Sequence, residues 1–325
     1  MTTVYFATNR NPLPPESPKD FGAGFSATNL GDLRFGQAEV VKGKMQAASI
    51  RVLPDNPEQG SKALFVSLRE AMRAQSRDSL LFIHGFNVSF RAAVESAAAI
   101  VEQYAKVTDG AYAPNIFVFT WPSDGEVTGY GNDRHDAEAS GFAVARGLIK
   151  LAGFLRQTDP ALACQQRINL LAHSMGNYVL RHALQQAQKI SNGGAMARLF
   201  DNIILTAADE DHDAFECDHK LARLPELAQR VTVYFNNGDL ALTVSDVTKG
   251  NPDRLGHDGP SKPHQIPAKV VIVDVSECVD QVVGHSYHVT CGKVVRDMVA
   301  VLNNESSEKI RARKYVPHAN KFRLA

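Results

Sequence analysis

Short apolar runs alternate with segments of helical periodicity along most of the chain. Runs rich in Val, Ile, Leu and Phe predict strands, and the segments between them repeat apolar residues every three or four positions, which predicts helices. The expected helices cover residues 62–75, 90–107, 136–157, 177–188 and 292–303, with partly helical structure over 214–229. The expected strands cover residues 79–86, 115–123, 167–174, 200–211, 230–239 and 268–277. This alternation predicts a doubly wound α/β fold, in which a mostly parallel sheet is covered by helices on both faces.

The two ends of the chain differ from this alternating middle. Residues 4–10 predict a strand, several prolines then interrupt regular structure, and residues 31–41 predict further β structure. We therefore expect a β-rich lead-in over residues 1–60, packed on a main domain of residues 61–303. Residues 304–325 carry many Lys and Arg and predict a solvated basic tail.

Composition and charge narrow the classes of partner. The chain has 325 residues, 44% of them hydrophobic, which is enough for the substantial core of a soluble globular protein. Lys plus Arg and Asp plus Glu each number 35, so no overall field favours nucleic acid or an anionic membrane. No leader and no apolar run of about 18 residues is recognisable, so a cytoplasmic location is the default. We expect a small-molecule partner and no nucleic acid, and the oligomeric state stays open.

The cysteines do not indicate a disulfide framework. The chain has four, too few and too scattered for one in a chain of this length. We expect reduced thiols. Cys278 and Cys291 bracket a short segment, however, so a single bridge between them stays an alternative.

Residue types needed for acyl transfer follow three of the predicted strands. Ser174 ends one strand, Asp239 ends the next to last, and His285 lies just after the final one. Active sites of open α/β sheets lie at the carboxyl ends of strands, and the chain order serine, acid, histidine is that of α/β hydrolases. The sequence therefore predicts a Ser-Asp-His site.

The stretch AHSMG, residues 172–176, surrounds Ser174 with small residues. It matches the nucleophile elbow G-x-S-x-G except that Ala172 replaces the first glycine. The turn from strand to helix at an elbow is so sharp that larger side chains two positions away would collide with neighbouring backbone. The alternative is that Ser174 only caps the following helix, a common role for serine.

A serine hydroxyl needs a neutral imidazole to take its proton and a carboxylate to orient that imidazole. His285 follows a glycine in an expected loop and is favoured over His288, which stands closer to the final helix. Asp239 follows the strand after which this fold usually places its acid, with Asp209 as the reserve. An ordinary turn residue after Asn-Gly is the alternative for Asp239.

Backbone N–H groups must also stabilise the negative oxygen of the intermediate. Met175 directly follows the nucleophile and is one expected donor. Phe86 is the other, because it follows His84 and Gly85 at the end of an earlier strand. We expect His84 to be a buried, hydrogen-bonded histidine that supports this loop.

Two other classes of function stay open. A metal site would draw on His285, His288 and Cys291 or on Asp209, Asp211, His212 and Asp213, but neither group has a recognised hydrolase-metal spacing. We expect no metal and no other cofactor. A binding protein that keeps an inactive hydrolase site is the second alternative.

Eight motifs in this order resemble a poorly characterised, mainly bacterial family of α/β hydrolases described as lipase- or esterase-like. They are VYFATNR, FIHGFNVSF, FTWPSDGEVTGYGNDRHDAEAS, LLAHSMGN, LTAADED, NNGDLAL, RLG and GHSY. The resemblance runs from residue 4 to about residue 302; the opening strand and the Trp-Pro-Ser segment are its more distinctive parts. It implies a Ser-His-Asp hydrolase fold, while the family's natural substrates are largely unknown.

The chain leaves little room for a lid. Only the 22 residues of 209–230 separate the two strands between which a cap is often inserted, which is room for about one helix. Loops are expected to roof the site, chiefly the Pro- and Gly-rich segment 240–267 and the segment that carries Trp121 and Tyr130. Both aromatics are candidates for an apolar pocket wall, although Trp121 is equally a candidate for plain core. We therefore expect a carboxylesterase for short- to medium-chain esters, with lipase, thioesterase and acyltransferase as alternatives.

Overall fold

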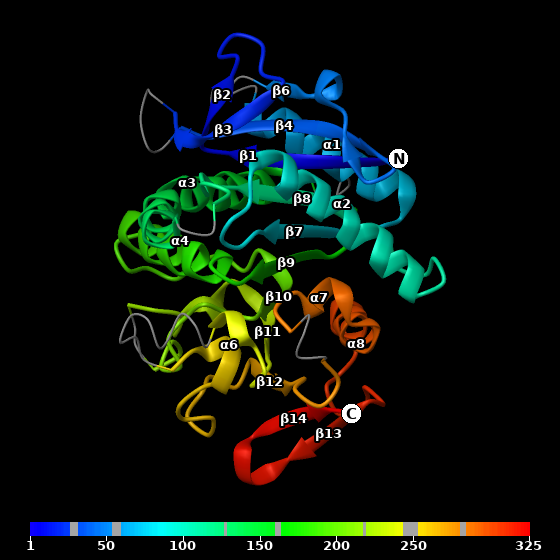
Figure 1. The fold of residues 1–325 in the computed structure, drawn as a ribbon, viewed down its shortest axis with the longest axis vertical. Coiled ribbons are helices and arrows are strands. Elements are labelled where there is room, and N and C mark those ends of the chain that lie inside the picture. The colour runs from blue at the N-terminus through cyan, green and yellow to red at the C-terminus, as the bar shows by residue number, and fades with distance from the viewer. Residues whose placement is uncertain are drawn as a thin grey trace.

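Twelve of the described strands form one continuous sheet (Figure 1). The computed structural model describes residues 1–26, 32–53, 60–126, 129–159, 164–216, 219–242, 253–279 and 284–325. The strands of the sheet are β1 (Thr2–Thr8), β4 (Arg34–Val41), β5 (Lys44–Met45), β6 (Arg51–Leu53), β7 (Ser79–Ile83), β8 (Asn115–Thr120), β9 (Ile168–His173), β10 (Phe200–Thr206), β11 (Ala228–Phe235), β12 (Val270–Asp274), β13 (Arg313–Val316) and β14 (Lys321–Leu324). Across the sheet they follow the order β13-β14-β12-β11-β10-β9-β7-β8-β1-β4-β5, and β6 pairs with β4.

The central strands of this sheet run parallel. Neighbours among β12, β11, β10, β9, β7 and β8 are all parallel, and β1 is parallel to β8. Antiparallel pairs occur toward the two edges, where β4 joins β1 and β13 joins β14. Because parallel strands end at the same edge of a sheet, the residues that follow β7, β9, β10, β11 and β12 lie near one another.

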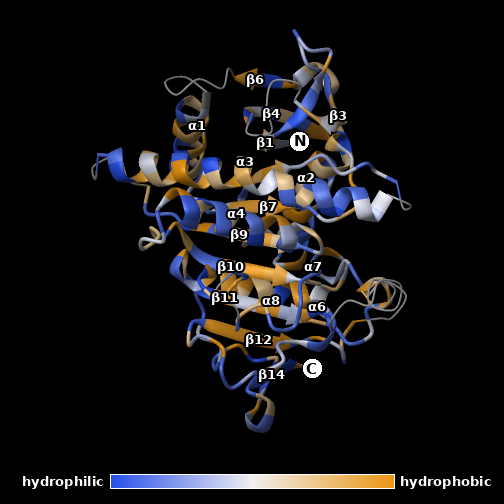
Figure 2. Cartoon of the chain, turned by 90° about the vertical axis from the view of Figure 1, so that its left-hand side faces the viewer, coloured by the Kyte–Doolittle hydropathy of each residue, from blue (hydrophilic) through white to orange (hydrophobic). Residues whose placement is uncertain are grey.

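Helices cover both faces of the sheet, each face with its own apolar core. The helices are α1 (Gly60–Gln75), α2 (Phe90–Val107), α3 (Tyr130–Gln157), α4 (Gly176–Ile190), α6 (Leu255–Asp258), α7 (Tyr287–Thr290) and α8 (Gly292–Leu302). α1, α3 and α4 contribute Phe65, Val144 and Leu180 to one core, and α2 and α8 contribute Val94 and Met298 to the other. Strands β10 and β12, which lie between these layers, are coloured hydrophobic in Figure 2. The predicted doubly wound α/β fold is confirmed.

The helix α2 begins and ends at the predicted residues 90 and 107. Ser89 caps it, since its side-chain oxygen accepts the backbone N–H of Ala92 at 3.3 Å. Helix α3 begins at Tyr130 instead of residue 136. Its first turn is polar and includes the buried Asp133, so the apolar pattern that marks a helix starts only later.

The prediction of partly helical structure over residues 214–229 is wrong for the residues described there. They form turns and one short 3-10 helix, Leu224–Glu226. Pro225 lacks a backbone N–H and restricts the residue before it, which opposes a regular α-helix. The segment therefore supplies no cap domain between β10 and β11.

The lead-in contributes to the main sheet. Its strands β1, β4, β5 and β6 extend the parallel sheet at one side, while β2 (Arg10–Leu13) and β3 (Asp20–Phe25) form a separate hairpin. Strand β1 is almost fully buried between β8 and β4. The boundaries at residues 60 and 303 stay predictions.

The interpretation of residues 304–325 as a solvated tail is wrong. β13 and β14 form a hairpin there, and β14 adds to the sheet beside β12 (Figure 1). Arg313 is fully buried at the side chain and forms an ion pair with Asp297 of α8, with 2.6 Å between Nη2 and Oδ1. Basic residues thus concealed a strand pair, because its stabilising partners come from the earlier helix α8.

Candidate active site

Ser174 stands at a sharp turn between β9 and α4. Its backbone has a φ of +53°, a left-handed conformation that non-glycine residues rarely adopt. The backbone N–H of Ser174 donates to Thr206 O at 3.0 Å, and its carbonyl oxygen accepts the side-chain amide of Asn177 at 2.9 Å. These bonds hold a strained residue at the carboxyl end of a central strand, which is the geometry of a nucleophile elbow.

Close backbone contacts explain the small residues around Ser174. A Cβ atom on Gly176 would lie 2.5 Å from Ile83 O and 2.6 Å from His84 O. A Cβ atom on Gly85 would lie 2.8 Å from the Cβ of Ser174. The segment after β7 therefore lies directly against the serine, and only glycine at 85 and 176 allows this approach.

His285 joins Ser174 to Asp239. Its Nε2 lies 2.9 Å from Ser174 Oγ, and its Nδ1 lies 2.8 Å from Asp239 Oδ2. A carboxylate only accepts hydrogen bonds, so Nδ1 carries the proton and Nε2 faces the serine as an acceptor. The three residues form one hydrogen-bonded chain across the ends of β9, β11 and β12.

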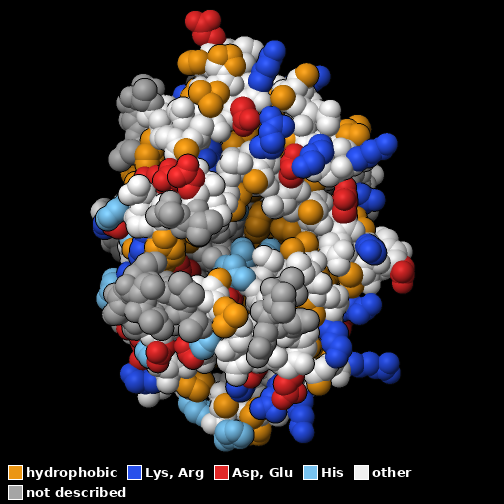
Figure 3. Space-filling view, viewed as in Figure 1, with side chains coloured by type: hydrophobic (Ala, Val, Ile, Leu, Met, Phe, Trp, Pro, Cys, Tyr) orange, Lys and Arg blue, Asp and Glu red, His pale blue; other side chains and the backbone are white. Residues whose placement is uncertain are grey.

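The imidazole and the serine are both reachable from solvent. The side chain of His285 is 28% exposed and Ser174 is 6% exposed, whereas Asp239 is fully buried. Figure 3 shows a hollow near the middle of one face of the molecule, with histidine side chains at its edge. This gradient of exposure suits a nucleophile and a proton carrier at the surface with a protected carboxylate behind them.

Asp239 is held by backbone donors. Its Oδ1 accepts the N–H groups of Ala241 at 3.1 Å and Leu242 at 3.4 Å, which leaves Oδ2 for His285. The reserve acid, Asp209, has different partners: Tyr130 Oη donates to its Oδ2 at 2.6 Å, and Arg254 Nε lies 3.4 Å from its Oδ1. The histidine is thus bonded to Asp239 and not to Asp209.

His288 is buried and does not contact Ser174. Its ring packs 4.2 Å from that of His173, centroid to centroid, and burial lowers its pKa to about 3. Burial also lowers the pKa of His173 well below its usual value, with the neighbouring His288 adding to the effect. Both rings therefore stay neutral at physiological pH, and His288 packs in the interior beside His173.

The two expected backbone donors, Met175 and Phe86, belong to the two segments that meet at Ser174. Neither the N–H of Phe86 nor that of Met175 donates to an acceptor among the residues that the structure describes. Met175 directly follows Ser174. Phe86 follows Gly85, which lies so close to the serine that a Cβ atom on it would stand 2.8 Å from Ser174 Cβ. Neither amide therefore has a competing acceptor within the described part of the chain.

His84 is buried and fixes the same segment. Its Nδ1 lies 2.8 Å from Gly85 O, and its Nε2 accepts the backbone N–H of Trp121 at 3.2 Å. Burial lowers the pKa of His84 to about 3, so the ring is neutral. It links the end of β7 to the end of β8.

Trp121 and Tyr130 differ in their surroundings. Trp121 has no exposed surface, stacks on His84 at 5.2 Å and donates its indole N–H to His84 O at 3.0 Å. Its assignment to the substrate pocket is wrong, because a fully enclosed ring offers nothing for a substrate to touch. Tyr130 is partly exposed and packs edge to face against Phe86 at 5.4 Å, so it stays a candidate for the pocket wall.

The structure also bears on three other points of the sequence analysis: a metal site, a membrane span and a disulfide. Within the described ranges no group of three or more His, Cys, Asp or Glu side chains is arranged to hold a metal ion, and no helix there has the length and apolar character of a membrane span. Cys278 and Cys291 are free thiols, and Cys291 Sγ lies 3.2 Å from Cys278 O. Residues 243–252 of the predicted 240–267 loop lie outside the described residues, as does Cys217.

His173, which hydrogen-bonds to the backbone of His285, was not identified from the sequence. His173 Nε2 lies 3.0 Å from His285 O, so a neutral His173 donates to the backbone that carries the exposed imidazole. Asn236 supports the preceding residue, donating its side-chain amide to Gly284 O at 3.1 Å. Side chains alternate between the two faces of a strand, so His173 is expected on the face opposite Ala172 and Ser174. No pattern in the sequence predicts which residues contact His173 on that face.

Comparisons with known proteins agree with the fold. A model of a family described as alpha/beta hydrolases of unknown function (DUF900) matches residues 62–303, which include Ser174, Asp239 and His285. An uncharacterised protein of Nostoc sp. (strain PCC 7120), alr1448, is 26% identical over 212 residues, and the match covers 51% of this chain and 53% of that relative. This chain thus aligns with about half the length of that protein. The family model covers most of the chain and its central parallel sheet, so the chain belongs to this family of α/β hydrolases.

Proposed function

We propose that the protein is a serine hydrolase that cleaves carboxylic esters through an acyl-enzyme intermediate. The observation that carries the proposal is the hydrogen-bonded chain from Ser174 Oγ through His285 to Asp239, with distances of 2.9 and 2.8 Å. The backbone amides of Phe86 and Met175 have no acceptor among the described residues, and they belong to the segments that adjoin this serine. Together these groups supply a nucleophile, a base, an orienting acid and an oxyanion site.

Each step of the reaction uses a group already in position. His285 Nε2 takes the hydroxyl proton as Ser174 Oγ attacks the acyl carbon, and the carbonyl oxygen becomes an oxyanion held by the two amides. When the bond to the alcohol breaks, His285 returns the proton to the leaving oxygen. Water, deprotonated by the same imidazole, then attacks the acyl-enzyme and releases the carboxylic acid and free Ser174.

Short- to medium-chain esters are the substrates that we propose. The described residues between β10 and β11 form turns and a short 3-10 helix in place of a cap, so the entrance has no large lid there. Phe86 and Tyr130 pack edge to face against each other, and we assign them to an apolar wall of the substrate pocket. We expect the rate to fall with long acyl chains and to show no jump when substrate exceeds its solubility limit. Strong activation by emulsified long-chain triglyceride would contradict this and favour a lipase.

The test of the proposed function is labelling and turnover in Ser174→Ala. Wild type is expected to react with a fluorophosphonate probe and to hydrolyse p-nitrophenyl esters, whereas the variant should lose label and on the order of 10⁴-fold or more in kcat. The fold should be unchanged because the substitution removes one oxygen atom and leaves the core packing intact. Retained turnover in a folded variant would overturn the nucleophile assignment.

The neighbouring histidines offer a matched pair for the same assay. His285→Ala should lose activity almost as severely as the serine variant, because no other imidazole contacts Ser174 Oγ among the described residues. His288→Ala should change stability more than turnover, since the ring is buried and packed against His173. A wild-type chain that neither labels nor turns over any ester or thioester would instead favour a binding protein on a hydrolase fold.

A further inference from the structure

Arg10 is a buried arginine at the start of β2, outside the region that the family model matches. The residue is 1% exposed. Its guanidinium donates to Thr120 Oγ1 at 2.9 Å, Gly22 O at 3.0 Å, Ser123 O at 3.2 Å and Val88 O at 2.6 Å. Arg10 stands just after β1, and its side chain therefore joins this strand by hydrogen bonds to the end of β8, to β3 and to the segment that follows Phe86.

The segment after Phe86 is fixed at three backbone positions. Val88 donates its N–H to Ser123 Oγ at 3.0 Å while its carbonyl oxygen accepts from Arg10. Asn87 donates its N–H to Asp133 Oδ2 at 3.3 Å and has a φ of +60°, a left-handed conformation. Ser123 Oγ in turn donates to Asp133. The turn is therefore held by a connected network and not by its own local preference.

Burying these charges opposes folding. Burial lowers the pKa of Arg10 to about 9, against the opposing influence of Asp133, so the guanidinium remains a cation at neutral pH. Burial likewise raises the pKa of Asp133, although Ser123 and two backbone amides offset part of the shift. An apolar side chain of similar volume would fill the same space without the desolvation cost. What an apolar side chain does not supply is a donor to Val88 O.

We infer that Arg10 is a positioning residue: by holding the Val88 carbonyl it sets the direction of the Phe86 N–H toward the oxyanion. This inference rests on the proposed function. The peptide planes of Phe86, Asn87 and Val88 are joined by two rotatable bonds per residue, so fixing Val88 and Asn87 limits the directions open to the Phe86 amide. An oxyanion donor is effective only when it is aimed before the charge develops. The lead-in, which carries Arg10, is then part of the catalytic apparatus.

The experiment compares Arg10→Met and Ser123→Ala with a control, Arg313→Met. Arg313 lies in the C-terminal hairpin, far along the sheet from Phe86. Its side chain is also fully buried, and it pairs with Asp297 of α8. Active sites are counted with the fluorophosphonate probe, and kcat is expressed per labelled site, so a loss of folded protein does not register as slower turnover. Affinity for an alkylboronic acid, which becomes tetrahedral on the serine and presents an anionic oxygen, reports on the oxyanion site separately.

We expect kcat per labelled site to fall about 10- to 100-fold in Arg10→Met, with KM changed by less than about threefold, because only a group used in the transition state is displaced. The boronic acid should bind more weakly by a similar factor. Ser123→Ala should show the same effects more weakly, and Arg10→Lys, which keeps one donor toward Val88 O, should recover part of the rate. Arg313→Met should lower thermal stability and leave kcat per labelled site unchanged.

Hydrogen exchange over residues 84–92 supplies a readout independent of turnover. The Asn87 and Val88 amides should exchange at least tenfold faster in Arg10→Met than in wild type or Arg313→Met. Unchanged kcat per site in both Arg10→Met and Ser123→Ala would overturn the inference, as would unchanged exchange. If Arg10→Met does not fold, Ser123→Ala alone decides. If wild type neither labels nor turns over an ester, the proposed function fails, and the exchange comparison still decides whether Arg10 anchors the turn.

Discussion

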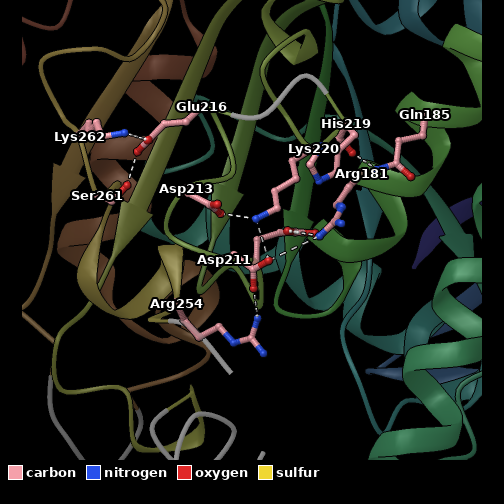
Figure 4. Close-up of polar contacts among 11 residues, drawn as sticks. Arg181, Gln185, Asp211, Asp213, Glu216, His219, Lys220, Arg254, Ser261 and Lys262 are labelled. Atoms are coloured by element: carbon pink, nitrogen blue, oxygen red, sulfur yellow. Dashed lines mark hydrogen bonds and ion pairs between the residues drawn. The ribbon is translucent and has the colours of Figure 1, made fainter. Parts of the chain in front are cut away.

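The residues after β10 and those after β11 both place carboxylates at the carboxyl ends of neighbouring parallel strands, but their partners differ. After β11, Asp239 gives one oxygen to His285. After β10, Asp209 and Asp211 face arginine and lysine. Asp211 lies between three cations, at 2.9 Å from Arg254, 3.0 Å from Lys220 and 3.8 Å from Arg181 (Figure 4).

This difference explains how one fold gives similar residues different roles. Arginine and lysine stay charged at neutral pH, so they neutralise a carboxylate but pass on no proton. Histidine gains and loses a proton in the range where enzymes work. The cluster after β10 therefore fixes the described turns of residues 209–216 and 219–220 against α4 and the Arg254 segment, while the carboxylate after β11 accepts a hydrogen bond from an imidazole.

Among changes to the carboxylates and basic residues of these two regions, Asp239→Asn is expected to have the largest effect. An amide at this position donates as well as accepts, so it no longer selects the His285 tautomer that faces Ser174 with an unprotonated Nε2. We expect kcat for p-nitrophenyl esters to fall on the order of 10³- to 10⁴-fold with little change in fold. Turnover equal to wild type would move the acid role away from Asp239 and erase the contrast between the two regions.

Arg254→Met should break the cluster after β10 without touching the other region. Its side chain is fully buried and pairs with both Asp209 and Asp211, so removal leaves carboxylates with less compensation. We expect a loss of about 3 to 5 kcal/mol in the free energy of unfolding, measured by urea denaturation. Arg323→Met is the control: its pair with Glu277 is 42% and 55% exposed, and such surface pairs contribute about 1 kcal/mol or less. Equal losses in the two variants would show that the cluster is not stabilising.

Glu210 predicts a pH dependence confined to the same cluster. Burial raises the pKa of Glu210 from 4.5 to about 7, despite the opposing charge of Arg181. The folded state then holds this proton more tightly than the unfolded state, so the contribution is complete below pH 4.5 and is lost as pH rises toward 7. Over that window Glu210→Gln, which does not ionise, should gain about 3 kcal/mol relative to wild type. Denaturation curves at pH 5 and pH 8 test this, and a constant difference between the two proteins would contradict it.

Asp209→Asn should have the smallest effect on turnover. The residue accepts a hydrogen bond from Tyr130 and forms an ion pair with Arg254, whereas His285 is hydrogen-bonded to Asp239. We expect kcat to stay within about tenfold of wild type, with the remaining loss arising from small shifts of Ser174, whose carbonyl oxygen accepts the Asp209 N–H at 3.3 Å. A loss as severe as that of Asp239→Asn would assign both carboxylates to the reaction.

Much of the architecture could be predicted from local pattern. Helix α2 begins and ends at the predicted residues, since Ser89 caps it and its apolar residues recur at helical spacing. The alternation of strands and helices implies crossover connections and therefore predicted a parallel sheet. The prediction for residues 214–229 failed at Pro225, which opposes a regular α-helix. The prediction for residues 304–325 failed because charged side chains there find their partners in distant elements. Arg313 illustrates this: its buried guanidinium is ion-paired with Asp297 of α8 and donates a hydrogen bond to Tyr234 Oη of β11.

By itself, the sequence determined the fold class, the strand after which each candidate residue stands, and the small residues that a sharp turn at Ser174 requires. These follow from interactions between residues near in the chain, where periodicity and steric limits act directly. Only the tertiary structure decided that His285 meets Asp239 rather than Asp209, that Trp121 is enclosed, and that Arg10 reaches the turn after Phe86. Such choices depend on distances of a few ångströms between residues separated by tens to more than a hundred positions, and packing of the whole domain sets those distances.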